Sequence, residues 1–236
     1  MRDLQARVTA IGADLGLAFD GDADRCFVVD EQGEIVSPST LTALIASREL
    51  KREPGSTVIH NLITSKSVPE IVVECGGNPV KTRVGHSFIK ATMAETNAVF
   101  GGEHSGHFYF RDFWRADSGM LAAMHTLAAL GMEQPGTTLS SMLAEFDRYA
   151  ASGEINTRVD DQQEVTSRIE HAYVNEPGVQ LDRMDGLTVD GGEWWFNVRP
   201  SNTEPLLRLN VEASDTVTME RLRDDVLTLM REGNSE

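Results

Sequence analysis

Short apolar runs alternate with amphipathic stretches over the first 131 residues. Apolar runs of about five residues predict strands, and apolar positions three and four apart predict helices. Strands are expected at 15–19, 26–30, 57–60, 79–82 and 98–100, and helices at 38–52, 67–75, 87–96 and 117–130. Residues 1–13 offer only about one turn of helix. This alternation predicts a doubly wound α/β domain.

The helix expected at 117–130 has the fullest set of end signals. Asp117 or Ser118 stands at its N-cap, and Gly131 follows its last residue. Its apolar positions recur at helical spacing: Met120, Leu121, Met124, Leu127 and Ala128. We expect this stripe to face the core of the domain.

From residue 132 onward the pattern changes. A linker at 132–152 holds a short helix at 139–149. Strands are then expected at 154–159, 186–190, 193–199 and 206–213, and helices at 162–175 and 216–231. Strand runs mixed with two helices predict a smaller α+β domain. The chain therefore divides into a partial α/β domain at 1–33, a doubly wound mixed α/β domain at 34–135, and the α+β domain at 150–236.

Composition narrows the classes of partner. Acidic residues outnumber basic ones by 37 to 21, for a formal net charge of −16. That balance argues against nonspecific nucleic-acid binding, which needs a basic face. The two cysteines, Cys26 and Cys75, match neither a disulfide framework nor a zinc pattern, so we expect a cytoplasmic location. We also expect no membrane partner, since no run reaches the roughly 20 apolar residues of a span.

An acidic loop follows the first apolar strand. Asp20, Asp22 and Asp24 alternate along a tight turn, so their carboxylates can converge on one hard cation such as Mg²⁺. Ligands in such folds bind at the carboxyl ends of strands, where this loop lies. Arg25 follows directly, and its guanidinium can hold a phosphate oxygen.

The same loop permits three other interpretations. Glu31 falls at the twelfth position of an EF-hand count, but Arg25 replaces the required glycine and the flanks are predicted strands. The start of the loop also resembles that of haloacid-dehalogenase-type phosphatases, with Asp20 as the nucleophile. The third interpretation is a solvated acidic turn without function.

A glycine-rich loop follows the strand at 98–100. Glu103 and Ser105 are spaced to face one side of an extended segment, where they can hydrogen-bond adjacent sugar hydroxyls. His107 can exchange a proton near neutral pH. Upstream, His86 begins a predicted helix and can meet a substrate oxygen, although Ser87 can equally serve only as the helix cap.

A third polar loop follows the aromatic strand at 193–199. Arg199 offers two parallel donors to a phosphate. Ser201, Asn202 and Thr203 add hydroxyl, amide and backbone donors on one turn, which is enough to hold a dianion without a metal. The alternative is a capped turn with an incidental arginine.

These three loops, in this order, resemble those of the alpha-D-phosphohexomutase superfamily, which includes phosphomannomutases and phosphoglucomutases. The resemblance covers essentially the whole chain. The loop from Asp20 to Arg25 matches the metal loop, the loop from Gly102 to His107 matches the sugar loop, and the loop from Arg199 to Thr203 matches the phosphate loop. The stretch 104–114 is most similar to phosphomannomutases.

The resemblance implies a phosphoryl transfer between C6 and C1 of a hexose phosphate, mannose favoured and glucose possible, through a hexose 1,6-bisphosphate. Mg²⁺ on Asp20, Asp22 and Asp24 would neutralise the phosphate of a phosphoserine, assisted by Arg25. The resemblance also implies sugar binding by Glu103, Ser105 and His86. Proton transfer would fall to His107 or, as a second choice, to His86. The phosphate would be bound by Arg199, Ser201, Asn202 and Thr203.

The family's nucleophilic serine lies in a stretch of the form Thr-Ala-Ser-His-Asn-Pro, which does not occur in these 236 residues. We therefore expect this chain alone to be inactive as a mutase and to need the missing N-terminal domains, in cis or in trans. The alternative hypothesis is a non-catalytic phosphosugar-binding remnant or subunit.

Overall fold

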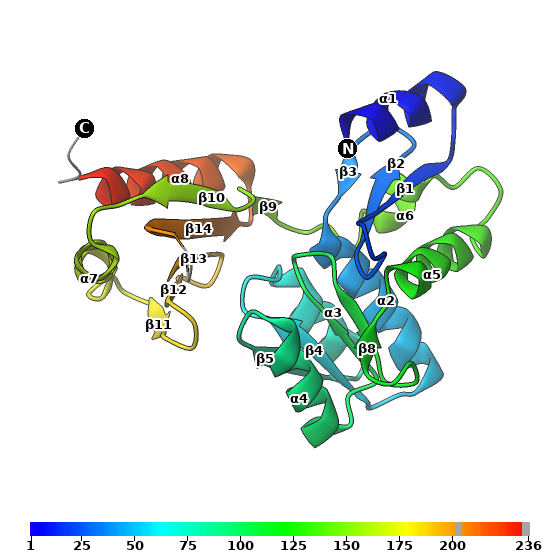
Figure 1. Cartoon of the computed structure of the whole chain (residues 1–236), viewed down its shortest axis with the longest axis horizontal. Helices are drawn as coiled ribbons and strands as arrows, with labels where there is room; N and C mark the ends of the chain where they lie inside the picture. The colour runs from blue at the N-terminus through cyan, green and yellow to red at the C-terminus, as the bar shows by residue number, and fades with distance from the viewer. Residues whose placement is uncertain (202–203, 233–236) are drawn as a thin grey trace. The chain divides into compact units, whose positions relative to one another are not determined.

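The computed structural model describes residues 1–201 and 204–232. The predicted phosphate ligands Asn202 and Thr203 therefore lie outside the described residues. The chain forms two compact units, Met1–Arg148 and Tyr149–Glu236 (Figure 1), and each is described by itself.

The first unit opens with helix α1 (Arg2–Ile11) and a small antiparallel sheet. This sheet has the order β1 (Leu15–Phe19), β2 (Cys26–Asp30), β3 (Ile35–Val36). The expectation of a single helical turn was wrong, because α1 has 10 residues. Its apolar residues lie close to the first strand: a Cβ on Gly16 would lie 2.6 Å from Val8 Cγ2. This packing stabilises a helix whose sequence signal is weak.

A second, mixed sheet forms the centre of the first unit. Its strands are β4 (Thr57–Asn61), β5 (Asn78–Thr82), β6 (Phe100–Gly102), β7 (Phe108–Phe110) and β8 (Ala116–Asp117), in the order β5-β4-β6-β7-β8. Strand β4 pairs in parallel with β5 and β6, whereas β7 and β8 are antiparallel. The sequence analysis predicted neither β7 nor β8, and it placed β6 two residues too early.

Helices cover both faces of this sheet. They are α2 (Pro38–Arg52), α3 (Ser67–Glu74), α4 (His86–Thr96) and α5 (Gly119–Gly131). The short α6 (Leu139–Leu143) lies against the hairpin β2–β3 instead. Tyr109 and Ile59 form a core with α4, whereas the neighbouring Phe108 and Val58 join the larger core with α2, α3 and α5. Alternate strand residues thus face opposite helix layers, which confirms the mixed, doubly wound α/β domain.

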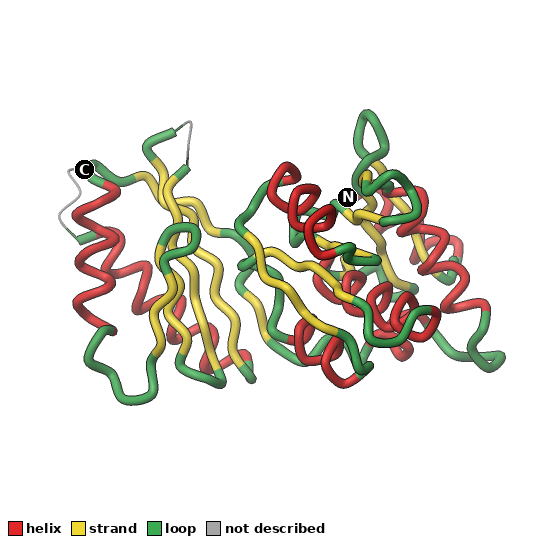
Figure 2. The backbone as a smooth tube through the Cα atoms, turned by 90° about the horizontal axis from the view of Figure 1, so that it is seen from below, coloured by secondary structure: helices red, strands yellow, loops and turns green. Residues whose placement is uncertain are grey.

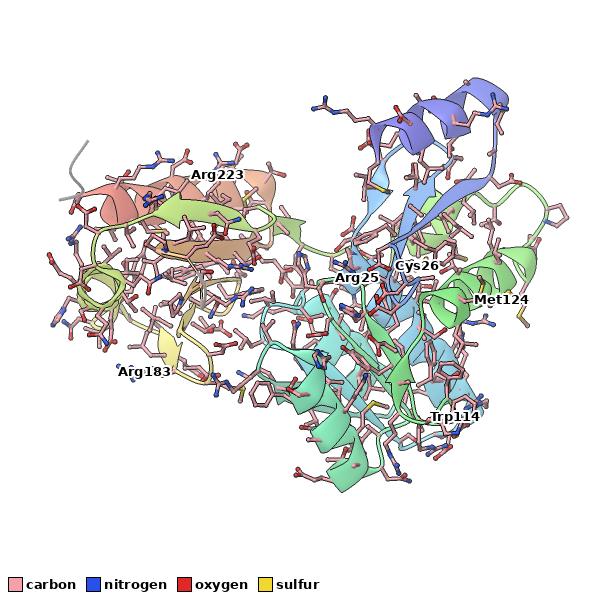
Figure 3. The ribbon with its side chains drawn as sticks, in the orientation of Figure 1. Arg25, Cys26, Trp114, Met124, Arg183 and Arg223 are labelled. Carbon is pink, nitrogen blue, oxygen red and sulfur yellow. The ribbon has the colours of Figure 1, made fainter. Side chains whose placement is uncertain are left out.

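The orientation predicted for α5 was wrong. Met120 and Met124 are each 55% exposed, and Figure 3 labels Met124 on this helix. The buried residues of α5 are the small ones: Gly119, Ala122, Ala123, Thr126 and Ala129. The helix contacts α2, β2 and β7, and small side chains allow a close approach to all three elements.

The second unit is an antiparallel sheet with two helices. Its strands are β9 (Ala150–Ala151), β10 (Ile155–Arg158), β11 (Gln180–Asp182), β12 (Leu187–Asp190), β13 (Trp194–Pro200) and β14 (Leu206–Ala213). The order is β10-β14-β13-β12-β11, and β9 also pairs with β14. Figure 2 shows α7 (Gln162–Tyr173) and α8 (Thr216–Arg231) on one side of this sheet, as the α+β prediction requires.

The core of the second unit lies between the sheet and its helices. Phe196 and Val198 of β13 pack with Ile169 of α7 and Val226 of α8. Asp161 and Asp215 cap the two helices through side-chain hydrogen bonds to backbone N–H groups. No helix in the described parts of the chain is both long and apolar enough to cross a membrane.

Candidate active site

The acidic loop brings its three carboxylates together. One carboxylate oxygen each of Asp20, Asp22 and Asp24 lies within 4.8 Å of the others. Ala23 adopts a left-handed conformation, with φ of 60°, which closes the turn between β1 and β2. Three oxygen donors at this spacing suit a hard divalent cation. The predicted metal ligands are therefore close enough to share an ion.

Arg25 forms two hydrogen bonds with Asp20, one of the three carboxylates. Its Nε donates to Asp20 Oδ2 at 2.6 Å, and its backbone N–H donates to Asp20 Oδ1 at 3.2 Å. Burial alone would raise the pKa of Asp20, but these hydrogen bonds outweigh it and lower the pKa to about 2. Asp20 is thus ionised at neutral pH and ready to bind a cation.

The pKa of Asp24 is shifted in the direction opposite to that of Asp20. Burial raises the pKa of Asp24, the charges of Asp20 and Asp22 add to the rise, and His107 opposes it. The Oδ1 atom of Asp24 is buried and has no hydrogen-bond partner among the described residues. A buried, unsatisfied carboxylate oxygen is costly unless a cation or a proton satisfies it. Arg25 Nε lies 3.9 Å from this oxygen, too far for a hydrogen bond, so an ion held by the three carboxylates would satisfy it.

The N-terminus of α5 lies against the acidic loop. A Cβ built on Gly119 would lie 2.5 Å from the carbonyl oxygen of Arg25 and 3.0 Å from that of Ala23. Only glycine permits this approach without displacing backbone. The backbone N–H of Leu121 donates to Ser118 Oγ at 3.2 Å, so of the two predicted N-cap residues, Asp117 and Ser118, it is Ser118 that caps the helix.

Asp117 contacts the side chains of His107 and Lys90 instead of capping α5. Its Oδ2 accepts from His107 Nδ1 at 2.8 Å, and its Oδ1 lies 3.0 Å from Lys90 Nζ. Asp24 Oδ2 is 3.7 Å from the same His107 nitrogen. Burial raises the pKa of Asp117, but Lys90 and His107 reverse this and hold it below its usual range. These contacts could not be predicted from the local pattern, because they join residues of separate elements.

The acidic loop and the glycine-rich loop are joined through backbone. Arg25 and His107 form an isolated antiparallel bridge, and Cys26 N–H donates to Gly106 O at 3.2 Å. The predicted proton-transfer residue is therefore held beside the predicted metal ligands. A ligand bound to the carboxylate cluster would lie within reach of His107.

Glu103 is buried at only 2% exposure and is tightly held. Tyr109 Oη donates to its Oε2 at 2.7 Å. Asn61 Nδ2 and Gly85 N–H donate to its Oε1 at 3.3 and 3.1 Å. Three donors among the described residues therefore fix the orientation of this carboxylate. Tyr109 and Asn61 were not expected in the site, because they meet Glu103 only through contacts between separate elements.

The other predicted sugar ligands are accessible. Ser105 is exposed at the tip of the glycine-rich loop, and His86 is exposed as the first residue of α4. Gly85 precedes that helix with φ of 129°, and no side chain caps it, so Ser87 does not have the capping role that was considered.

The phosphate loop belongs to the second unit. Arg199 is the penultimate residue of β13, and its Nη2 donates to Glu154 Oε2 at 2.9 Å. The other oxygen of Glu154 accepts from Arg208 Nη1 at 3.2 Å. Ser201 is buried, and its backbone N–H donates to Leu206 O at 2.8 Å. The sequence analysis did not identify Glu154 or Arg208, since nothing in the local pattern links them to Arg199.

Three family models match successive parts of the chain. They describe phosphoglucomutase/phosphomannomutase alpha/beta/alpha domain II at residues 1–33, alpha/beta/alpha domain III at 37–149, and the C-terminal domain at 154–229. The chain belongs to this family, the alpha-D-phosphohexomutase superfamily.

Individual relatives agree with this assignment. The chain is 41% identical over 230 residues to a phosphomannomutase of Methanocaldococcus jannaschii, a match that covers 98% of the chain and 50% of that protein. A crystal structure of a phosphoglucomutase/phosphomannomutase family protein from Burkholderia thailandensis matches with a TM-score of 0.85 and 30% identity, over 99% of this chain and 50% of that one. The chain thus spans about half the length of the curated relatives that it matches.

A more distant structure shows the same fold. It is that of Aspergillus fumigatus N-acetylphosphoglucosamine mutase in complex with GlcNAc-6P and magnesium. It matches with a TM-score of 0.66 and 15% identity, over 92% of this chain and 52% of that chain.

Proposed function

We propose that this chain carries the metal, sugar and phosphate sites of a phosphohexomutase that interconverts hexose 6-phosphate and hexose 1-phosphate, with mannose preferred and glucose accepted. The observation that carries the proposal is the carboxylate cluster Asp20, Asp22 and Asp24, closed by Arg25 and adjacent to His107. The relatives named phosphomannomutase support the choice of mannose.

In this proposal Asp20, Asp22 and Asp24 hold Mg²⁺. The unsatisfied Asp24 oxygen and the low pKa of Asp20 support this assignment, as does the magnesium in the fungal relative's complex. Bound there, the ion would neutralise charge on the phosphoryl group during transfer. Arg25 orients Asp20 and keeps donors near the same phosphate.

His107 moves the hydroxyl proton of the sugar. Asp117 accepts from its Nδ1, so the Nε2 atom is left as the proton acceptor. Glu103, held in place by Tyr109, Asn61 and Gly85, accepts from a sugar hydroxyl. Ser105 and His86 supply exposed polar groups for other sugar hydroxyls. Lys90 holds Asp117 in place from the other side.

Arg199 and Ser201 bind the phosphate that is not transferred, and Asn202 and Thr203 are kept in the proposal as further ligands. The phosphoryl group comes from a phosphoserine outside these 236 residues, and a hexose 1,6-bisphosphate serves as intermediate and activator. A cytoplasmic location is part of the proposal, since the cysteines Cys26 and Cys75 are both free.

Ligand titration followed by NMR tests this proposal. Mannose 1-phosphate should shift the signals of Ser105 and His107, and Arg199→Ala should weaken its binding. The matched control is Arg223→Ala on α8, whose guanidinium pairs only with Asp224 among the described residues. Asp22→Asn should abolish the signal changes that Mg²⁺ causes in the acidic loop.

Other outcomes would favour a different function. A phosphatase activity that Asp20→Asn removes and Arg199→Ala leaves intact would show that Asp20 is a nucleophile. Binding of mannose 1-phosphate that is unaffected by Arg199→Ala would contradict the assignment of the phosphate loop.

A further inference from the structure

One face of the β13–β14 pair carries successive polar pairs. The register places opposite each other Trp195 and Glu212, Asn197 and Asn210, and Arg199 and Arg208. Trp195 Nε1 donates to Glu212 Oε1 at 2.8 Å, and both Asn197 and Asn210 are buried. A ladder of polar pairs therefore runs along the two strands to the start of the phosphate loop.

The last pair of this ladder places two cations side by side. Like charges directly opposite each other destabilise an antiparallel pair. Glu154, which directly precedes β10, lies between them: its Oε2 binds Arg199 Nη2 at 2.9 Å and its Oε1 binds Arg208 Nη1 at 3.2 Å. The side chains of Arg199, Glu154 and Arg208 are 14%, 28% and 32% exposed. One carboxylate thus compensates two largely desolvated guanidiniums.

We propose that Arg208 is a positioning residue of the phosphate site, an inference that rests on the proposed role of Arg199. Glu154 fixes the Arg199 guanidinium by holding one of its nitrogens. Arg208 takes up the other half of the Glu154 carboxylate, so that Arg199 keeps a net positive charge for an incoming phosphate.

The charges of the three side chains support this division. Two guanidiniums and one carboxylate sum to one net positive charge. Without Arg208, Arg199 and Glu154 would cancel, and a phosphate dianion would meet a carboxylate without a compensating cation.

The Nε donors of the two arginines also support the proposal. The Nε atoms of both arginines are buried and have no hydrogen-bond partner in the described parts of the chain. A phosphate oxygen that reached the Nε of Arg199 would satisfy this donor. Glu154 can keep its contacts while this donor binds the ligand.

Binding of inorganic phosphate to the whole chain, followed by NMR titration at fixed low salt, tests the inference. Arg208→Met should raise the Kd for phosphate about tenfold, the effect of losing one charged interaction. Arg208→Lys, which keeps the charge, should stay within about threefold of the unaltered chain. Adding Glu154→Gln to Arg208→Met should bring the Kd back toward that of the unaltered chain, because Arg199 is no longer neutralised.

Two results would overturn the inference. An unchanged Kd in Arg208→Met would show that Arg208 serves only the strand pairing. A raised Kd that Glu154→Gln does not reverse would show that Arg208 contacts the phosphate directly. If Arg208→Met does not fold, Glu154→Gln alone tests the charge argument. The amide oxygen of glutamine can still accept from Arg199, so phosphate binding should tighten, and unchanged or weaker binding would contradict the argument.

A parallel titration with mannose 1-phosphate separates this inference from the proposed function. If the variants behave as expected with inorganic phosphate but mannose 1-phosphate binds no more tightly, only the proposed sugar specificity fails. If mannose 1-phosphate binds and depends on Arg199 but not on Arg208, only the present inference fails. If neither ligand binds, both are overturned.

Discussion

At the scale of single residues, the tautomer of His107 is determined by the atoms around its Nδ1. Asp117 Oδ2 lies 2.8 Å away and Asp24 Oδ2 3.7 Å away, and both are acceptors. An ionised carboxylate can only accept, so the proton of a neutral His107 belongs on Nδ1. This leaves Nε2 free to take a proton from a substrate hydroxyl.

We predict that Asp117→Asn disturbs this tautomer. Imidazole nitrogen chemical shifts measured by NMR should report Nδ1–H for His107 in the unaltered chain and a mixture or the opposite tautomer in the variant. His60 is the internal control, because its Nδ1 lies 3.1 Å from the carbonyl oxygen of Asn61 and its strand β4 is separated from β8 by β6 and β7. A His107 tautomer that is identical in both proteins would contradict the claim that Asp117 determines it.

The site residues that the sequence could predict are those that lie together along the chain. Asp20, Asp22 and Asp24 belong to one turn, and their convergence needs no tertiary information. Tyr109, Asp117 and Glu154 reach their partners only through strand pairing and packing. Their roles could not be predicted, because a single sequence does not state which distant residues meet.

At the scale of elements, α5 connects the core to the acidic loop. Its first residue, Gly119, leaves no room for a Cβ against the backbone of Arg25. The methyl group of an alanine there would have to displace either the helix or the loop that carries the carboxylates.

We therefore predict that Gly119→Ala destabilises the chain by about 1–3 kcal/mol, the usual cost of overpacking. Gly131→Ala, at the other end of the same helix, is the matched control, since its Cβ would meet nothing within 4 Å. That control should be neutral or stabilising by up to about 1 kcal/mol through helix propensity. Urea unfolding of both variants checks this, and equal stabilities would contradict the close approach.

A second element-level contact ties the hairpin β2–β3 to α6. Glu31 accepts from both the backbone N–H and the hydroxyl of Ser140, the second residue of α6. Burial alone would raise the pKa of Glu31, but these hydrogen bonds outweigh it and lower the pKa from 4.5 to about 2. A lowered pKa in the folded state means that this contact stabilises the fold above pH 4.5 and is lost toward pH 2.

Glu31→Gln should accordingly cost about 1 kcal/mol of unfolding free energy at pH 7, as for other side-chain helix caps. The difference from the unaltered chain should shrink steadily as the pH falls below 4.5. Urea unfolding at pH 7, 4.5 and 3 measures this, with Glu95→Gln on the exposed side of α4 as the control. A difference that is the same at pH 3 and pH 7 would contradict the assigned pKa.

Most elements could be predicted from periodicity and end signals, and α8 matches its expected range. The exceptions have physical causes. Strands β7 and β8 have three and two residues, too few for any period to show. The face of α5 was reversed because hydrophobicity was taken to decide burial, whereas close packing selected its glycine and alanines.

At the scale of the whole molecule, the chain consists of two units with separate cores. Ile89 lies in a core of the first unit, and Ile169 lies in the core of the second. Neither side chain is exposed at all. Each unit has the apolar interior that an independent folding unit needs.

We predict that the two units unfold in separate transitions. Ile169→Ala should destabilise the second unit by about 2–5 kcal/mol, and Ile89→Ala should destabilise the first by a similar amount. Hydrogen exchange resolved by residue should show that each substitution lowers protection in its own unit only. Loss of protection throughout the chain in both variants would mean that the units unfold together.

At this scale the central proposal is that these residues act in a phosphohexomutase and receive their phosphoryl group from a serine outside this chain. The direct measurement is turnover of mannose 1-phosphate with Mg²⁺ and a hexose 1,6-bisphosphate, by the purified chain alone and with the first half of a phosphomannomutase relative added. We expect no turnover by the chain alone, and turnover by the mixture that Asp22→Asn abolishes. Robust turnover by the chain alone would contradict the proposal, because a residue of this chain would then carry the phosphoryl group. Asp20 would be the first residue to test for that role.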